Sequence, residues 1–133
     1  MRGSVHRSLL IFIKIYDIIY ISKERKDRKN MGVKIWVDDV RPMPKGYDFH
    51  FHSVNETIDA INYIEAKQKY SIDLLSLDHD AGEFCADGGD YIRILDYLEE
   101  HNISIPIHIH SANVVGINNM KRIIEKNNWK YVY

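Results

Sequence analysis

Residues 33–39 read Val-Lys-Ile-Trp-Val-Asp-Asp, a nearly continuous apolar run that is followed by two aspartates. An apolar run of this length, interrupted only by Lys34, is typical of a β-strand that is buried on both faces. Two more runs, at residues 72–77 and 103–109, have the same form and also end in polar residues. The sequence therefore predicts three buried strands, each with chemically reactive side chains at its end.

Helical patterns lie between these strands. Residues 53–56 match a capping box, in which a serine and a glutamate bond free backbone N–H groups at a helix start. Isoleucines at helical spacing extend this helix over residues 54–68, and apolar stripes predict further helices over residues 91–102 and around residues 120–124. The remaining expected elements are two short strands, at residues 48–52 and 129–133.

Strands that alternate with helices of about ten to fifteen residues indicate right-handed crossovers and a parallel sheet with helices on both faces. The sequence thus predicts an α/β fold of three layers around a mostly parallel, five-stranded sheet. Residues 41–46 contain two prolines and a glycine, which leave no room for a helix. We therefore expect the first helix to be reduced to a loop.

Length and composition limit the class of protein. The chain has 133 residues, the size of one domain, and its 45% hydrophobic and 28% charged residues argue against disorder. A single cysteine, Cys85, excludes an internal disulfide and a cysteine-based zinc cluster. The longest apolar run, residues 9–21, contains Lys14 and Asp17 and is too short to span a bilayer. We expect a cytoplasmic protein without a transmembrane segment.

Charge divides the chain at Met31. Residues 1–30 hold 8 basic and 3 acidic residues, whereas residues 31–133 hold 10 and 16. We therefore expect an N-terminal extension, residues 1–30, and one folded domain, residues 31–133. The extension has three open interpretations: upstream sequence translated from an early start codon, a peripheral membrane or partner-binding segment, or a degenerate signal peptide. The acidic domain argues against tight binding to long nucleic acid.

The polar ends of the three buried strands form the candidate site. In a parallel sheet these ends converge on one edge, where ligands bind. Four aspartates then lie close together, and like charges at short range raise one another's pKa or recruit a metal ion. The set consists of Asp38, Asp39, Asp78 and Asp80. Oxygen ligands suit Mg²⁺, although each acidic pair alone is equally compatible with a helix cap or a solvated loop.

This arrangement resembles the receiver domain of response regulators. That family carries an acidic pair after its first strand, a phospho-accepting aspartate after its third and a serine or threonine after its fourth. Asp38-Asp39, Asp78 and Ser111 match these places in order. The lysine that receivers carry after the fifth strand has no match, since Lys130 lies before or within the expected last strand.

Three further motifs resemble a divergent group, the cyclic-phosphate processing receiver domains. They are Asp-Asp-Val-Arg-x-x-Pro at 38–44, Leu-Asp-His-Asp at 77–80 and His-x-His-Ser-x-Asn-x-x-Gly-x-x-Asn-Met at 108–120. The resemblance covers residues 31–133. It implies a receiver-like (flavodoxin-like) fold for this domain and action on cyclic phosphates of RNA or nucleotide origin.

Roles for individual residues follow from the charges and the resemblance. The predicted ligands of a divalent metal, Mg²⁺ or alternatively Mn²⁺, are Asp38, Asp39 and Asp78. Asp78 is alternatively a nucleophile. The predicted catalytic residues are Asp78, His79, Asp80 and His110, with the histidines as general acid and base and Asp80 orienting one of them. The histidines are alternatively hydrogen-bonded structural residues. The predicted phosphate-binding residues are Arg41, Ser111, Asn113, Gly116 and Asn119.

Three functions remain open from the sequence. The first is a metal-dependent phosphoesterase that hydrolyses a cyclic phosphate or a related ester of nucleotide or RNA origin. The second is a signalling receiver that accepts a phosphoryl group on Asp78, which the missing lysine disfavours. The third is a catalytically silent binding module. The expected partner is a small phosphorylated substrate or an RNA end.

Overall fold

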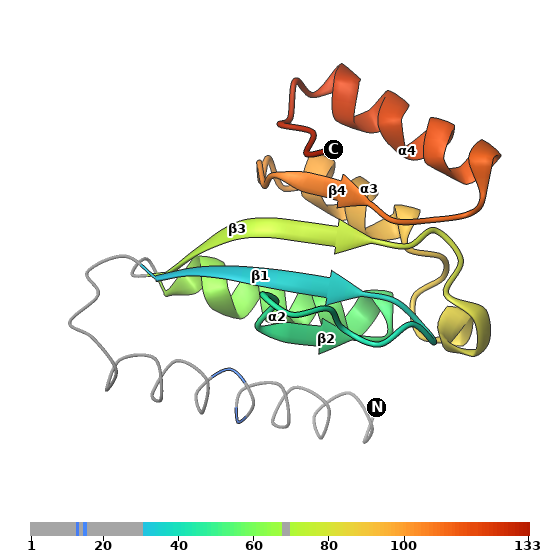
Figure 1. Ribbon diagram of the computed structural model, residues 1–133. Helices are drawn as coiled ribbons and strands as arrows, with labels where there is room; N and C mark the ends of the chain where they lie inside the picture. Colours follow the sequence, from blue (N-terminus) through green and yellow to red (C-terminus); the bar gives the residue numbers. More distant parts are fainter. Residues whose placement is uncertain (1–12, 14, 16–30, 68–69) are drawn as a thin grey trace.

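The computed structural model describes residues 13, 15, 31–67 and 70–133 of the chain (Figure 1). The three interpretations of residues 1–30 therefore concern a segment that, except for Ile13 and Ile15, lies outside the described residues. Ile15 is fully buried and packs in the hydrophobic core, whereas Ile13 is half exposed. The division of the chain at Met31 stays a prediction. No described helix has both the length and the apolar character needed to cross a membrane.

The described strands form one parallel sheet in the order β2-β1-β3-β4. Their bounds are β1 Met31–Val37, β2 Phe49–Phe51, β3 Tyr70–Leu77 and β4 Ile107–Ile109. The parallel α/β fold that the sequence predicts is confirmed. The expected strand over 103–109 pairs only in its last three residues, and the expected fifth strand is represented by one bridge between Tyr131 and Ile107.

Three α-helices and one 3₁₀-helix connect the strands. They are α2 Val54–Ala66, η1 Gly82–Ala86, α3 Ile92–Glu100 and α4 Val114–Lys126. The predicted capping box starts α2: Ser53 Oγ accepts from Glu56 N at 3.1 Å, and Glu56 Oε1 accepts from His52 N at 2.9 Å. The segment from 38 to 48 contains only bends and turns, and η1 lies between β3 and α3.

The three α-helices form one layer, because α3 packs against both α2 and α4. The crossovers from β2 to β3 and from β3 to β4 run in the same direction along the sheet, so right-handed connections place α2 and α3 on the same face. The buried Val33, Ile35, Val37, Leu75 and Leu77 supply the apolar core of the two central strands. No described α-helix belongs to a second layer on the other face.

The side chains on the other face are mostly polar or aromatic. Alternation along the strands, together with their register, forms a row across the sheet: His50, Trp36, Ser76 and His108. Two residues further along each strand stand His52, Asp38, Asp78 and His110. The polar strand ends therefore continue a polar sheet face, and they do not emerge directly from the apolar core.

Candidate functional site

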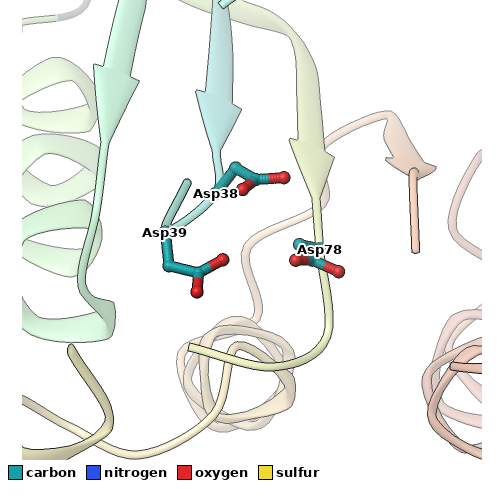
Figure 2. A group of neighbouring side chains, drawn as sticks. All are labelled: Asp38, Asp39 and Asp78. Atoms are coloured by element: carbon teal, nitrogen blue, oxygen red, sulfur yellow. The ribbon is translucent and has the colours of Figure 1, made fainter. Parts of the chain in front are cut away.

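Three carboxylates gather at the carboxyl ends of β1 and β3. Val37 pairs with Leu77, so the residues that follow, Asp38 and Asp78, lie side by side at the sheet edge. Carboxylate oxygens of Asp38, Asp39 and Asp78 lie within 4.8 Å of one another, and Figure 2 shows them around a common space beyond the two strands. The convergence that the sequence predicts for these three aspartates is thus present in the fold.

Asp38 is fully buried, and its charge is compensated on every side. Its Oδ1 accepts from the backbone N–H groups of Val40 at 2.9 Å and Arg41 at 2.8 Å. Its Oδ2 accepts from His110 Nε2 at 2.9 Å and lies 3.6 Å from Arg41 Nη1. Burial raises the pKa of this carboxyl, but the backbone N–H groups and His110 together outweigh burial and leave the pKa lowered. Asp38 is therefore an ionised group held in a fixed orientation.

Asp39 and Asp78 lack comparable compensation. Burial and the charges of Asp38 and Asp78 raise the pKa of Asp39. Asp78 Oδ1 accepts from the backbone N–H of His79 at 2.8 Å, and within the described part of the chain neither Asp39 nor Asp78 forms an ion pair. A site of oxygen donors with unneutralised charge fits a hard divalent cation such as Mg²⁺ or Mn²⁺.

Gly82 lies against the open side of this acidic group. It has a φ of +55°, and a Cβ at this position would come within 2.3 Å of Asp39 Oδ2. Glycine adopts this left-handed conformation readily and leaves space for the carboxylate. The turn into η1 thus approaches the acidic cluster closely only because residue 82 has no side chain.

His110 is enclosed between two strands. Its ring stacks on Trp36 with centroids 3.5 Å apart and planes inclined by 6°. Nδ1 lies 2.7 Å from Ser76 Oγ, while Nε2 bonds Asp38. Burial lowers the pKa of His110 to about 4. Both ring nitrogens therefore have protein partners, and this contact set favours a positioning role over the proton transfer that the sequence suggested for His110.

His79 has a different environment, at the start of α4. Its Nδ1 lies 2.8 Å from Asp80 Oδ1, and this hydrogen bond lowers the pKa of Asp80. Asn113 Nδ2 lies 3.3 Å from both carboxylate oxygens of Asp80, and Asn113 Oδ1 caps α4 by accepting from Gly116 N at 2.9 Å. A Cβ on Gly116 would come within 2.4 Å of His79 Cγ. Four predicted site residues therefore form one local cluster.

Arg41 reaches the site from the loop after β1. Its Nη1 donates to the carbonyl oxygen of His110 at 2.8 Å, and its own carbonyl oxygen accepts from Trp36 Nε1 at 3.2 Å. Asp48, another acidic residue of this loop, accepts from the backbone N–H of Lys34 at 2.8 Å. The guanidinium side chain is 46% exposed, so part of its donor set faces solvent beside the carboxylates.

Two predicted phosphate-binding residues make other contacts. Ser111 Oγ accepts from the backbone N–H of Asn113 at 3.1 Å, in the turn that leads into α4. Asn119 lies in the second turn of α4, where its side chain contacts Arg122 at 3.4 Å. Among the described residues, no hydrogen bond connects Asn119 to the acidic cluster. The phosphate-binding roles of both residues stay predictions.

The sequence analysis missed three residues around Asp38. Ser76 and Trp36 contact the His110 ring, and His50 Nε2 lies 3.0 Å from the carbonyl oxygen of Asp38. Strand alternation could have found the first two, because they lie two residues before Asp78 and Asp38 on the same face. His108, which lies two residues before His110, bonds the carbonyl oxygen of Val132 through Nδ1 at 2.9 Å.

Comparison with known families identifies the family of this domain. The model of the cyclic-phosphate processing receiver domain matches residues 33–126, which run from β1 to the end of α4. The matched range includes every predicted site residue. The comparisons with curated proteins and with solved structures gave no match. The family match covers most of the chain, and on this basis the protein belongs to the cyclic-phosphate processing receiver domains.

Proposed function

We propose that this protein is a metal-dependent hydrolase that opens a cyclic phosphate, or a related phosphoester, of nucleotide or RNA origin. The observation that carries the proposal is the pair Asp39 and Asp78, whose carboxylates share one space without an ion-pair partner among the described residues. Two further groups lie close to these aspartates in the sequence. Arg41, with its partly exposed guanidinium, comes two residues after Asp39, and the His79–Asp80 pair directly follows Asp78.

Asp38, Asp39 and Asp78 would hold a divalent ion, Mg²⁺ or Mn²⁺, with Asp38 held in a fixed orientation by its own hydrogen bonds. When bound, the ion clamps phosphate oxygens and stabilises the charge that develops in the transition state. The exposed N–H groups of Arg41 supply a planar donor set that matches two phosphate oxygens. Together these groups support binding of a small anionic phosphate at the carboxyl edge of the sheet.

His79 is the proposed proton donor. When water attacks the phosphorus of a cyclic phosphate, one P–O ester bond breaks and the leaving oxygen takes up a proton. Asp80 accepts a hydrogen bond from Nδ1, which leaves Nε2 to face the substrate, since no partner for Nε2 occurs among the described residues. The Asp80 carboxylate fixes the imidazole orientation, and the proton that the attacking water releases returns to the ring, which completes the cycle.

Turnover of cyclic phosphates tests this function directly. The full chain is incubated with a panel of nucleoside 2′,3′-cyclic phosphates and RNA with cyclic 3′ ends, with Mg²⁺ or Mn²⁺ or with chelator, and products are followed by phosphorus NMR. We expect metal-dependent ring opening that Asp78→Asn abolishes. Intact substrates in the presence of bound metal would contradict the hydrolase.

A phospho-accepting receiver is the second candidate, because Asp78 follows β3, where receivers carry their phosphorylated aspartate. No lysine amine lies within 4.0 Å of the three carboxylates in the described part of the chain, which disfavours this candidate. Labelling by acetyl phosphate that is lost in Asp78→Asn, without turnover of any cyclic phosphate, would replace the hydrolase with this function.

A further inference from the structure

We infer that Ser76, acting through the His110 ring, positions the Asp38 carboxylate and thereby sets the metal affinity of the acidic cluster. Ser76 is a positioning residue in this scheme, since it has no contact with the carboxylates themselves. The inference rests on the metal site of the proposed function. It adds a residue that lies inside the sheet, two positions before Asp78.

The contacts form one continuous chain across three strands. Ser76 Oγ in β3 lies 2.7 Å from Nδ1 of His110, which follows β4, and Nε2 of the same ring lies 2.9 Å from Oδ2 of Asp38, which follows β1. Ser76 and Asp38 are fully buried, and the His110 side chain is 10% exposed. A change at Ser76 therefore reaches Asp38 through a ring that has almost no contact with water.

Two further contacts define the ring orientation. Trp36 stacks on the face of the His110 ring with centroids 3.5 Å apart, and the ring cannot slide or tilt without losing this contact. Arg41 Nη1 bonds the carbonyl oxygen of His110 at 2.8 Å and therefore holds its backbone. With the plane and the backbone held, the hydroxyl of Ser76 selects the rotation of the ring that directs Nε2 at Asp38.

In this arrangement Ser76 and His110 support a metal ligand without binding the metal themselves. Groups that bond a metal ligand orient it, and their loss typically weakens metal affinity by about ten- to a hundredfold. In this protein the supported ligand set would include Asp38, whose Oδ1 is already held by two backbone N–H groups. Oδ2 is the oxygen whose position depends on side chains, and the Ser76–His110 chain acts on that oxygen.

Mn²⁺ binding to the full chain, measured by the EPR signal of the unbound ion, tests the chain of contacts. We expect Ser76→Ala to weaken binding about tenfold, because the ring loses its Nδ1 partner. Ser76→Thr retains the hydroxyl and is expected to bind within about threefold of wild type. The matched control is Ser71→Ala, the same change at an exposed position in the same strand. Wild-type affinity in Ser76→Ala would overturn the inference.

Two substitutions at His110 keep the test valid if Ser76→Ala folds poorly. His110→Gln carries an amide N–H near the place of Nε2 and cannot transfer a proton, so we expect it to retain most of the Mn²⁺ affinity. His110→Ala lacks any donor to Asp38, and we expect a loss of at least tenfold. Equal losses in both variants would overturn the positioning role.

A metal-free measurement separates this inference from the proposed function. In chelator, nitrogen NMR of the His110 ring is expected to change in Ser76→Ala and to stay unchanged in Ser71→Ala. Wild-type protein that binds no Mn²⁺ would contradict the proposed metal site, while a displaced ring signal would still support the positioning chain. An unchanged ring signal in Ser76→Ala would overturn the inference whatever the metal data show.

Discussion

Two carboxylate–imidazole pairs flank this site, and they differ chiefly in burial. Asp38 and His110 lie 2.9 Å apart with side chains that are 0% and 10% exposed. Asp80 and His79 lie 2.8 Å apart with side chains that are 60% and 15% exposed, so the carboxylates differ in burial far more than the imidazoles do. The inner pair has a partner on every ring nitrogen, whereas the outer pair leaves Nε2 of His79 without a partner among the described residues. Under the proposed function, the same chemical pair would serve as a support inside and as a proton carrier outside.

Solvent access explains the difference. In the interior, the loss of hydration disfavours a charged imidazole and makes every unpaired polar group costly, so the inner pair is stable only with its bonds complete. At the surface, water screens the charge of the exposed Asp80 carboxylate. The two pairs should therefore respond in opposite ways to substitution, which gives four experiments.

Removal of the outer imidazole should affect turnover most. His79→Ala loses the proposed proton donor, and we expect the rate of cyclic-phosphate opening to fall by about 10²- to 10⁴-fold. Mn²⁺ affinity should stay near wild type, because His79 contributes only its backbone N–H to Asp78. The matched control is His101→Ala, a histidine on the far end of α3 whose ring contacts Tyr97. Unchanged turnover in His79→Ala would remove the outer pair from the reaction.

Removal of the inner imidazole should affect folding most. His110→Ala leaves Asp38 buried without its side-chain donor and removes the ring from Trp36. We expect the free energy of unfolding to fall by about 2–4 kcal/mol, measured by urea denaturation of the full chain. His79→Ala serves as the comparison and should lose less than about 1 kcal/mol. Equal losses in the two variants would contradict the distinction between the pairs.

As the pH falls, the free energy of unfolding should respond to His110 before it responds to Asp80. The pKa of His110 is lowered from 6.5 to about 4 by burial, so between these pH values the unfolded chain binds more protons than the folded protein. The free energy of unfolding therefore has its full value above pH 6.5, falls by about 2–3 kcal/mol between pH 6.5 and 4, and changes no further through His110 below pH 4.

Urea unfolding in chelator between pH 7 and pH 4 measures this loss. The raised pKa of Asp39 makes the folded protein more stable at low pH, which is the opposite effect. This effect is common to wild type and His110→Gln, so the difference between their unfolding free energies isolates the contribution of His110. The lowered pKa of Asp80 places the change of the outer pair below its ordinary 3.8. Parallel pH profiles for wild type and His110→Gln would show that His110 does not titrate in this window.

A methyl group on Gly116 should disturb only the outer pair. Alanine is favoured over glycine in a helix by about 0.5–1 kcal/mol, yet the added Cβ would come within 2.4 Å of His79 Cγ. We expect Gly116→Ala to lower turnover about tenfold through the displaced ring, with little change in urea stability. Val115→Ala, an exposed neighbour in α4, is the control and should match wild type. Wild-type turnover in Gly116→Ala would show that the position of the His79 ring is not limiting.

Much of the fold follows from local patterns in the chain. Apolar runs locate β1 and β3, and the capping box over residues 53–56 locates the start of α2. The strand expected over 103–109 is shorter in the structure, because pairing reaches only its last three residues. The last segment of the chain pairs through Tyr131 alone. The length over which a strand pairs depends on its neighbour in the sheet, so β-propensity alone could not predict the lengths of these two strands.

The position of the acidic cluster could be predicted from the sequence, but which of its carboxylates is neutralised could not. Asp38, Asp39 and Asp78 follow strands that a parallel sheet aligns, which is a consequence of connectivity. Which carboxylate is neutralised depends on the loop after β1, which folds Arg41 back over Asp38. No sequence pattern indicates that Asp39 is left with a raised pKa.

The residue types, their spacing and the order of the strands are sufficient to place aspartates and histidines at one sheet edge. They do so because the period of a strand and the hand of a crossover are local properties of the backbone. The two imidazoles are exposed to a similar degree, and what distinguishes the pairs is the carboxylate, buried in Asp38 and 60% exposed in Asp80. That difference in burial is a property of the packed molecule. Trp36, Ser76 and Asp38 come from two strands and enclose one ring, whereas the outer ring rests on the start of α4. Because solvation decides how an imidazole behaves, identical side chains acquire different roles only after the chain has folded.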